Sequence, residues 1–303
     1  MIFRACGEVA ALILPYPENT TDALVRVTGI SVLRSWVALT IMSLFLTSGA
    51  MAQEAGLKRL DNGDDAKAWE AVGRLDIDGK GFCTGALIAP SLVLTAAHCM
   101  FDTQTGALIN EGHVEFLAGW RNGRAGAYRD VARVVIHPAY IYGSNVSSER
   151  VRNDLALLEL DQPIRSTSIK PFKTTARPRT GDRVGVVSYA LDRAEAPSLQ
   201  ELCSVLARQD GVLVTSCSVD FGSSGAPIFV IEDGEAQIVS VVSAKAEVHG
   251  EKVSLGTALG QPLAELQAEL VAGRAIYMGD KRGERRIRVG DDRGDTGAKF
   301  LRP

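Results

Sequence analysis

Short apolar runs separated by turn residues fill the middle of the chain and predict β-structure. Because the runs are short and closely spaced, they favour a sandwich or barrels over alternating strand–helix units. Asp233-Gly234 stands between the last two runs and predicts a hairpin turn. The expected strands are 71–75, 86–89, 92–95, 131–136, 155–160, 183–187, 211–215, 228–231 and 238–242.

Three other regions depart from this pattern. Residues 163–178 are polar and contain several prolines, which indicates a linker. Leu263, Leu266 and Leu270 share one face of a helix that we expect near 262–271. Residues 273–303 are rich in glycine and carry charges of both signs, so we expect a flexible charged tail there.

The N-terminal region has the pattern of a secretory signal peptide. Residues 36–49 carry no charge, arginines precede them, and Ala50-Met51-Ala52 is a small-residue exit. A run of about 14 residues is short for a membrane span, which needs about 20. We therefore expect residues 1–52 to be a leader, cleaved before Gln53, and 53–70 to be an N-terminal segment. The mature protein would be secreted or periplasmic with no stable membrane insertion; an uncleaved anchor is the alternative.

The net charge of −3 argues against a nucleic-acid-binding protein, which usually has a basic excess. Removing the leader leaves four cysteines, and an even number in an exported chain implies disulfides. A metal site and free thiols are the alternatives, but a four-cysteine zinc site usually brings close cysteine pairs, which this sequence lacks. No acidic calcium-loop spacing occurs either, so we expect no metal and no cofactor.

Three separated motifs together supply one kind of chemistry. Their central residues are His98 in Thr-Ala-Ala-His-Cys, Asp154 in Asn-Asp-Leu-Ala-Leu-Leu, and Ser224 in Gly-Ser-Ser-Gly-Ala-Pro. Each motif alone has a plain structural explanation: an ordinary histidine, a turn aspartate or a loop serine. Their order, the cysteine beside the histidine and the secretory leader are together improbable by chance.

With these motifs the chain resembles the chymotrypsin/trypsin-like serine endopeptidases, and it looks closest to the bacterial glutamyl endopeptidase-like branch. The resemblance runs from about Leu60 to Leu270 and includes the segments 82–88 and 134–140. The Ser224 motif resembles Gly-Asp-Ser-Gly-Gly-Pro, with Ser223 in place of the aspartate and Ala226 in place of the last glycine.

The resemblance implies an all-β fold of two six-stranded antiparallel barrels with the site between them. The first barrel would span 71–165 and hold the histidine and the aspartate. The second would span 166–272, hold the serine and end in a short helix. The resemblance also implies one disulfide between Cys83 and Cys99, which leaves Cys203 to pair with Cys217.

Catalytic roles follow from the same resemblance and from the chemistry of the groups. A serine hydroxyl is a poor nucleophile at neutral pH, so Ser224 needs His98 as its base. Asp154 would hold the imidazole in the useful tautomer. The backbone N–H groups of Gly222 and Ser224 would form the oxyanion hole. We expect peptide or protein substrates; a catalytically weak or inactive protease-like binding module is the alternative.

The residues of the substrate pocket are less clearly marked. Ser218 occupies the position of the acidic pocket floor in trypsins, six residues before the serine. Asp220 either faces the pocket and favours a basic side chain or is solvated. Ser243 and Lys245 lie in a segment that resembles the strand that pairs with the substrate backbone. Val242 stands where glutamyl endopeptidases carry a histidine, which argues against glutamate specificity.

Activation should also differ from that of trypsins. In those enzymes a freed N-terminal amine pairs with the aspartate before the serine, and Ser223 cannot form such an ion pair. Leu60 follows Lys58-Arg59 in a faint likeness to the family's activation site. Asp220 is the remaining acidic candidate for a partner of the amine.

Overall fold

The computed structural model describes residues 56–109, 114–143, 146–175, 178–248 and 250–277. These ranges all belong to one unit, Gln53–Pro303. The expected leader, 1–52, lies outside the described residues. Within the described ranges, no helix is both long enough and apolar enough to cross a membrane.

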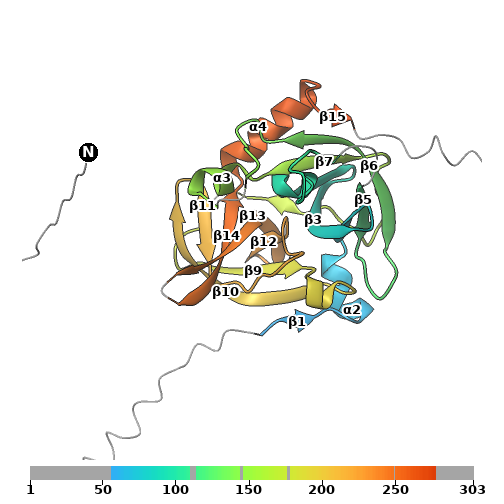
Figure 1. The fold of residues 1–303 in the computed structure, drawn as a ribbon. Coiled ribbons are helices and arrows are strands. Elements are labelled where there is room, and N and C mark those ends of the chain that lie inside the picture. The colour runs from blue at the N-terminus through green and yellow to red at the C-terminus, as the bar shows by residue number, and fades with distance from the viewer. Residues whose placement is uncertain (1–55, 110–113, 144–145, 176–177, 249, 278–303) are drawn as a thin grey trace, which may run out of the picture. The chain divides into compact units, whose positions relative to one another are not determined.

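The N-terminal half forms a closed antiparallel barrel (Figure 1). Its strands follow the order β6-β5-β2-β3-β4-β7, and pairing of β6 with β7 closes the ring. The bounds are β2 Val72–Ile77, β3 Gly81–Ala89, β4 Leu92–Thr95, β5 Val114–Ala118, β6 Ala127–Ile136 and β7 Ala156–Leu160. A short C-terminal strand, β15 (Ile276–Tyr277), adds to β6.

The C-terminal half forms a second closed barrel in the order β10-β11-β14-β13-β12-β9, with β9 paired to β10. The bounds are β9 Arg183–Ser188, β10 Ser198–Gln209, β11 Val212–Thr215, β12 Pro227–Glu232, β13 Glu235–Val248 and β14 Glu251–Ala258. Strand β1 (Lys58–Arg59) pairs with β10, and β8 (Lys173–Thr174) runs parallel to β13. The two antiparallel barrels of six strands each confirm the expected fold class.

The helices are short except for the last one. They are α2 Gly63–Ala66, η1 Lys67–Trp69, η2 Ala97–Met100, α3 Ser148–Asn153, η3 Leu191–Arg193 and α4 Gly260–Val271. The expected C-terminal helix is α4, which buries Leu263 and Leu266. Helix α4 contacts β6 and β7, so it packs on the first barrel. The domain boundaries expected from the sequence had grouped this helix with the second barrel.

The flexible tail expected from residue 273 onwards is wrong in its first part. Ile276 and Tyr277 pair with Val134 and Arg133 of β6, because β5 pairs only with residues 127–130 and leaves this side of β6 open. Residues 278–303 lie outside the described residues. The expected linker, 163–178, likewise contains the short strand β8.

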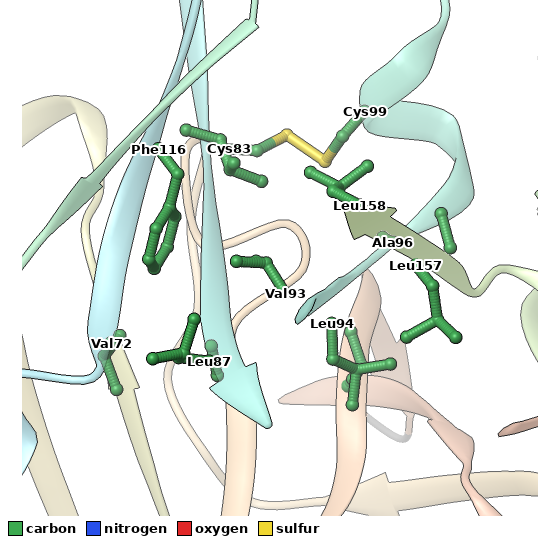
Figure 2. Packing of buried hydrophobic residues seen from close by; sticks show 14 of the residues in the cluster. Val72, Cys83, Leu87, Val93, Leu94, Ala96, Cys99, Phe116, Leu157 and Leu158 are labelled. Carbon is green, nitrogen blue, oxygen red and sulfur yellow. A yellow bond between two sulfur atoms is a disulfide. The ribbon is translucent and has the colours of Figure 1, made fainter. Parts of the chain in front are cut away.

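Aliphatic and aromatic side chains fill the interior of the first barrel (Figure 2). Val72, Leu87, Val93, Phe116 and Leu157 are fully buried there. Burying a side chain of this size contributes about 1.5–3 kcal/mol. This interior holds β4 and β7 firmly, and the loops at their ends carry the histidine and aspartate motifs.

An aromatic cluster joins the two barrels. Trp69 on η1, Phe172 in the connection between barrels and Phe229 on β12 lie in mutual contact, with ring centroids 4.7–6.2 Å apart. Such pairs add about 0.5–1.5 kcal/mol to the effect of area burial. The cluster fixes the barrels against each other and hence the relative positions of the motifs that they carry.

Candidate active site

His98 and Asp154 meet at one end of the first barrel. Strand β4 ends at Thr95, and the chain turns into η2, which carries His98. Asp154 is fully buried and caps the C-terminus of α3, just before β7. Its carboxylate accepts two hydrogen bonds from His98, one from ring Nδ1 (2.7 Å) and one from the backbone N–H (2.8 Å).

A third donor reaches the same carboxylate from the second barrel. The Ser243 hydroxyl of β13 donates to Oδ2 of Asp154 at 2.5 Å. A buried carboxylate is costly unless it is hydrogen-bonded, and these three bonds supply that compensation. Since a carboxylate only accepts, Nδ1 of His98 must donate, and in the neutral imidazole Nε2 then carries the lone pair.

The sequence predicts Ser243 as a residue of the substrate pocket. The structure adds a contact that was not expected, the hydrogen bond from its hydroxyl to Asp154. Nothing in the sequence signals this contact, because the two residues lie 89 positions apart and Ser243 belongs to no motif.

The serine loop comes close to the strands that lead to His98. The carbonyl of Ser224 accepts from Thr84 N–H at 2.8 Å, and Gly225 N–H donates to the Val242 carbonyl at 2.8 Å. A Cβ on Gly225 would lie 2.1 Å from the Thr95 hydroxyl oxygen, and the φ of Gly225 is +78°. Only glycine fits there, so this position brings half-buried Ser224 beside the His98 segment.

Ser223, which precedes the candidate nucleophile, is fully buried and uncharged. Its hydroxyl lies 3.1 Å from the Ser188 hydroxyl and 3.2 Å from the Tyr189 carbonyl. It also accepts from Asp220 N–H at 3.3 Å. Neutral hydrogen bonds thus hold the loop at this position.

Gly222 completes the loop with a φ of +95°. Its carbonyl accepts from the Thr84 hydroxyl at 2.8 Å, which fixes the Gly222–Ser223 peptide, and the preceding carbonyl, that of Phe221, accepts from Leu191 N–H at 2.8 Å. Among the described residues, the N–H groups of Gly222 and Ser224 have no hydrogen-bond acceptor. Both groups are therefore available to a ligand oxygen.

The remaining pocket candidates are exposed. Ser218 N–H donates to the Gln200 side chain at 2.7 Å. Asp220 forms an ion pair with Lys245 at 2.7 Å, and both side chains are about half exposed. The hydrogen bond from Lys245, with that from Phe221 N–H, lowers the pKa of Asp220. The Asp220 carboxylate is thus both partly solvated and paired with Lys245.

Both disulfides join the pairs expected above. Cys83–Cys99 ties β3 to η2 beside His98 (Figure 2), and Cys203–Cys217 ties β10 to the segment before the serine loop. The ligand atoms of Cys83, His98 and Cys99 lie within 4.8 Å of one another. Both sulfurs belong to the disulfide, so these residues offer no thiolate to a metal.

His137, the other histidine that the structure describes, does not enter this group. His137 is buried, and its Nε2 lies 3.0 Å from Glu265 on α4, although the two atoms are not aligned for a hydrogen bond. Burial lowers the pKa of His137, and the Glu265 carboxylate opposes that shift. His113 and His249 lie outside the described residues.

Comparison with known proteins decides the family. A family model described as Trypsin matches residues 61–258, which is well over half of the chain. The chain belongs to the trypsin family. The match begins just after Leu60 and includes all three motifs.

Individual relatives agree with this assignment. The chain is 27% identical over 150 residues to a glutamyl endopeptidase of Bacillus licheniformis, a match that covers 49% of this chain and 45% of the relative. It is 33% identical over 121 residues to brachyurin of Leptuca pugilator, covering 40% of this chain and 48% of the relative. The matches therefore span somewhat less than half the length of each relative.

A solved structure of Glu endopeptidase in complex with MPD has the same fold. The TM-score is 0.59 at 18% identity, over 73% of this chain and 98% of the other. At this identity the likeness extends to the fold alone.

Proposed function

We propose that this protein is an exported serine endopeptidase in which Ser224, His98 and Asp154 form the catalytic triad. The doubly hydrogen-bonded His98–Asp154 pair carries the proposal, because it fixes the imidazole with Nε2 free to accept a proton. Membership of the trypsin family supports a peptidase reaction. Its substrates would be peptides or proteins.

The proposed reaction proceeds through an acyl-enzyme. The Ser224 hydroxyl oxygen attacks the scissile carbonyl carbon while His98 Nε2 takes the hydroxyl proton. His98 then gives that proton to the leaving amine, and the C–N bond breaks. The same nitrogen then takes a proton from a water molecule, whose oxygen attacks the ester carbonyl carbon. The bond from that carbon to the Ser224 oxygen breaks, and the His98 imidazolium returns the proton to Ser224. Asp154 stabilises the imidazolium that forms in both halves.

The carbonyl oxygen gains negative charge in each tetrahedral intermediate and needs donors that are already in place. The N–H groups of Gly222 and Ser224 would supply them. Two observations support this assignment. Neither group has a protein acceptor among the described residues, and the carbonyls of the same two peptide groups, those of Phe221 and Ser223, accept from the N–H groups of Leu191 (2.8 Å) and Ala226 (2.9 Å).

We also propose export to the extracellular or periplasmic space. The sequence pattern of residues 1–52 and the two disulfides support it, because disulfides persist in oxidising compartments.

Paired serine substitutions test the proposal. Ser224→Ala should fold normally and lose peptidase activity on the order of 10⁶-fold, the scale seen when the nucleophile of another serine protease is removed. Ser223→Ala is the matched control and should retain substantial activity, since it loses only neutral hydrogen bonds. A fully active Ser224→Ala protein would refute the triad. A wild-type protein that is folded, mature and inert would indicate the inactive binding module instead.

A further inference from the structure

An exposed ion pair lies beside the candidate serine. Asp220 stands four residues before Ser224, and Lys245 stands two residues after Ser243, whose hydroxyl binds Asp154. Lys245 Nζ and Asp220 Oδ1 are 2.7 Å apart, with the side chains 53% and 56% exposed. The pair therefore bridges the two segments next to Ser224: the serine loop and β13.

The charges at this rim cancel one another. Ser218 and Ser243 are neutral, and Asp220 and Lys245 are paired with each other. Arg193 also acts electrostatically on Asp220, but it forms its own ion pair with Asp192 at 3.0 Å.

Apolar surface accompanies this neutral rim. The Phe221 ring is 70% exposed, and Lys245 Nζ lies 4.3 Å from its centroid. Leu191 is 73% exposed and donates its N–H to the Phe221 carbonyl at 2.8 Å. Large exposed apolar side chains that adjoin a reactive group are typical of a binding surface.

We propose that Lys245 and Asp220 are specificity-determining residues. Because their charges neutralise each other, they select substrates with an uncharged side chain on the residue that contributes the scissile carbonyl. This proposal rests on the peptidase function proposed above. A charged substrate side chain loses part of its hydration here. It must then compete with Lys245 for Asp220, or with Asp220 for Lys245, to gain an ion pair. A neutral side chain meets Phe221 without that competition.

This arrangement predicts opposite effects for the two partners. Lys245→Met keeps the aliphatic stem but leaves Asp220 unpaired, so peptides with lysine should gain about tenfold in kcat/KM relative to the neutral peptide. Asp220→Asn keeps an acceptor for Phe221 N–H but leaves Lys245 unpaired, so peptides with glutamate should gain about tenfold. A tenfold change corresponds to about 1.4 kcal/mol. The double variant should return to the wild-type preference.

The test measures kcat/KM on two matched peptide pairs that differ only at the residue before the scissile bond: glutamine against glutamate, and norleucine against lysine. Wild type should cleave the neutral member of each pair at least as well as the charged member. Lys173→Met is the control, because Lys173 of β8 forms an exposed ion pair of the same kind with Glu235 at the other end of β13 from Lys245. It should leave both ratios unchanged.

The outcomes separate this inference from the peptidase function. Fluorophosphonate labelling of each variant reports an intact active site independently of substrate choice. If wild type is labelled and cleaves peptides but prefers glutamate or lysine by tenfold or more, the inference is wrong and the peptidase function stands. The same holds if both single variants keep the wild-type ratios. If one variant fails to fold, the other still tests the inference, since a shift in the kcat/KM ratio of defined sign is predicted for each variant. Absence of labelling and of cleavage in wild type overturns both.

Discussion

Asp154 is the residue on which the proposed chemistry depends most. Its buried carboxylate accepts from the ring and backbone of His98 and from Ser243. Asp154→Asn places an amide where the second acceptor oxygen was, and an amide N–H facing Nδ1 favours the wrong tautomer of His98. We expect kcat for peptide hydrolysis to fall about 10⁴-fold with the fold unchanged.

Ser243→Ala is the control for this prediction. It removes one hydrogen bond from the carboxylate and keeps both bonds to His98, so the loss in kcat should be much smaller. An Asp154→Asn enzyme with near wild-type kcat would remove Asp154 from the proposed triad.

At the level of single residues, the sequence was informative where a motif surrounded the residue. His98, Asp154 and Ser224 each sit in such a motif. The Ser243–Asp154 and Asp220–Lys245 contacts could not be predicted, because they join positions 89 and 25 residues apart: the first lies between the two barrels and the second lies within the second barrel. The sequence around Asp220 did not reveal its environment, because its ion-pair partner Lys245 lies 25 residues away.

Among the structural elements, the serine loop depends on the close approach of Gly225 to β4. Gly225→Ala would put a methyl group 2.1 Å from the Thr95 hydroxyl and 2.3 Å from the Thr84 carbonyl. Overpacking and a left-handed backbone together should cost about 2–5 kcal/mol of unfolding free energy, measurable by denaturant titration. Activity should also fall, because Ser224 must move with its neighbour.

Gly234→Ala separates the two causes. Gly234 has the same φ, +78°, but nothing lies within 4 Å of its Cβ position. It should lose only the backbone contribution, about 1–2 kcal/mol. Equal losses in the two variants would show that the approach to β4 does not matter.

Strands with a continuous apolar run could be predicted from the sequence, whereas strands that lack such a run could not. The run at 92–95 is β4, and the hairpin at Asp233-Gly234 has both turn residues at positive φ, as this turn type requires. Strand β10 contains no long apolar run: its first three residues are buried, its last four are exposed, and buried and exposed positions alternate only from Cys203 to Leu206. Strand β15 is only two residues long, and pairing with β6, rather than its own sequence, creates it.

At the scale of the whole molecule, the N-terminal segment reaches the serine loop through the sheet. Arg59 of β1 pairs with Ser198 of β10, and Ser198 pairs with Ser188 of β9. The Ser188 hydroxyl in turn contacts the Ser223 hydroxyl. Leu60 is buried, and its N–H donates to the Pro197 carbonyl at 2.9 Å. The segment is thus docked with the chain uncut at Arg59.

We therefore expect activity without cleavage after Arg59. Ser223 offers no carboxylate to a buried ammonium, and Asp220 is exposed and paired with Lys245. A protein that begins at Gln53 with one extra N-terminal residue should hydrolyse peptides about as fast as one cut after Arg59. Activity that appears only after the cut, and that Asp220→Asn abolishes, would make Asp220 the partner of the new amine.

The most direct test of the proposed triad is to react the folded mature protein with a fluorophosphonate and to locate the adduct by peptide mass spectrometry. Such reagents modify a serine only when a base activates it. We predict a single adduct on Ser224, lost in both Ser224→Ala and His98→Ala and retained in Ser223→Ala. A folded protein that gives no adduct, or one on Ser223, would contradict the account.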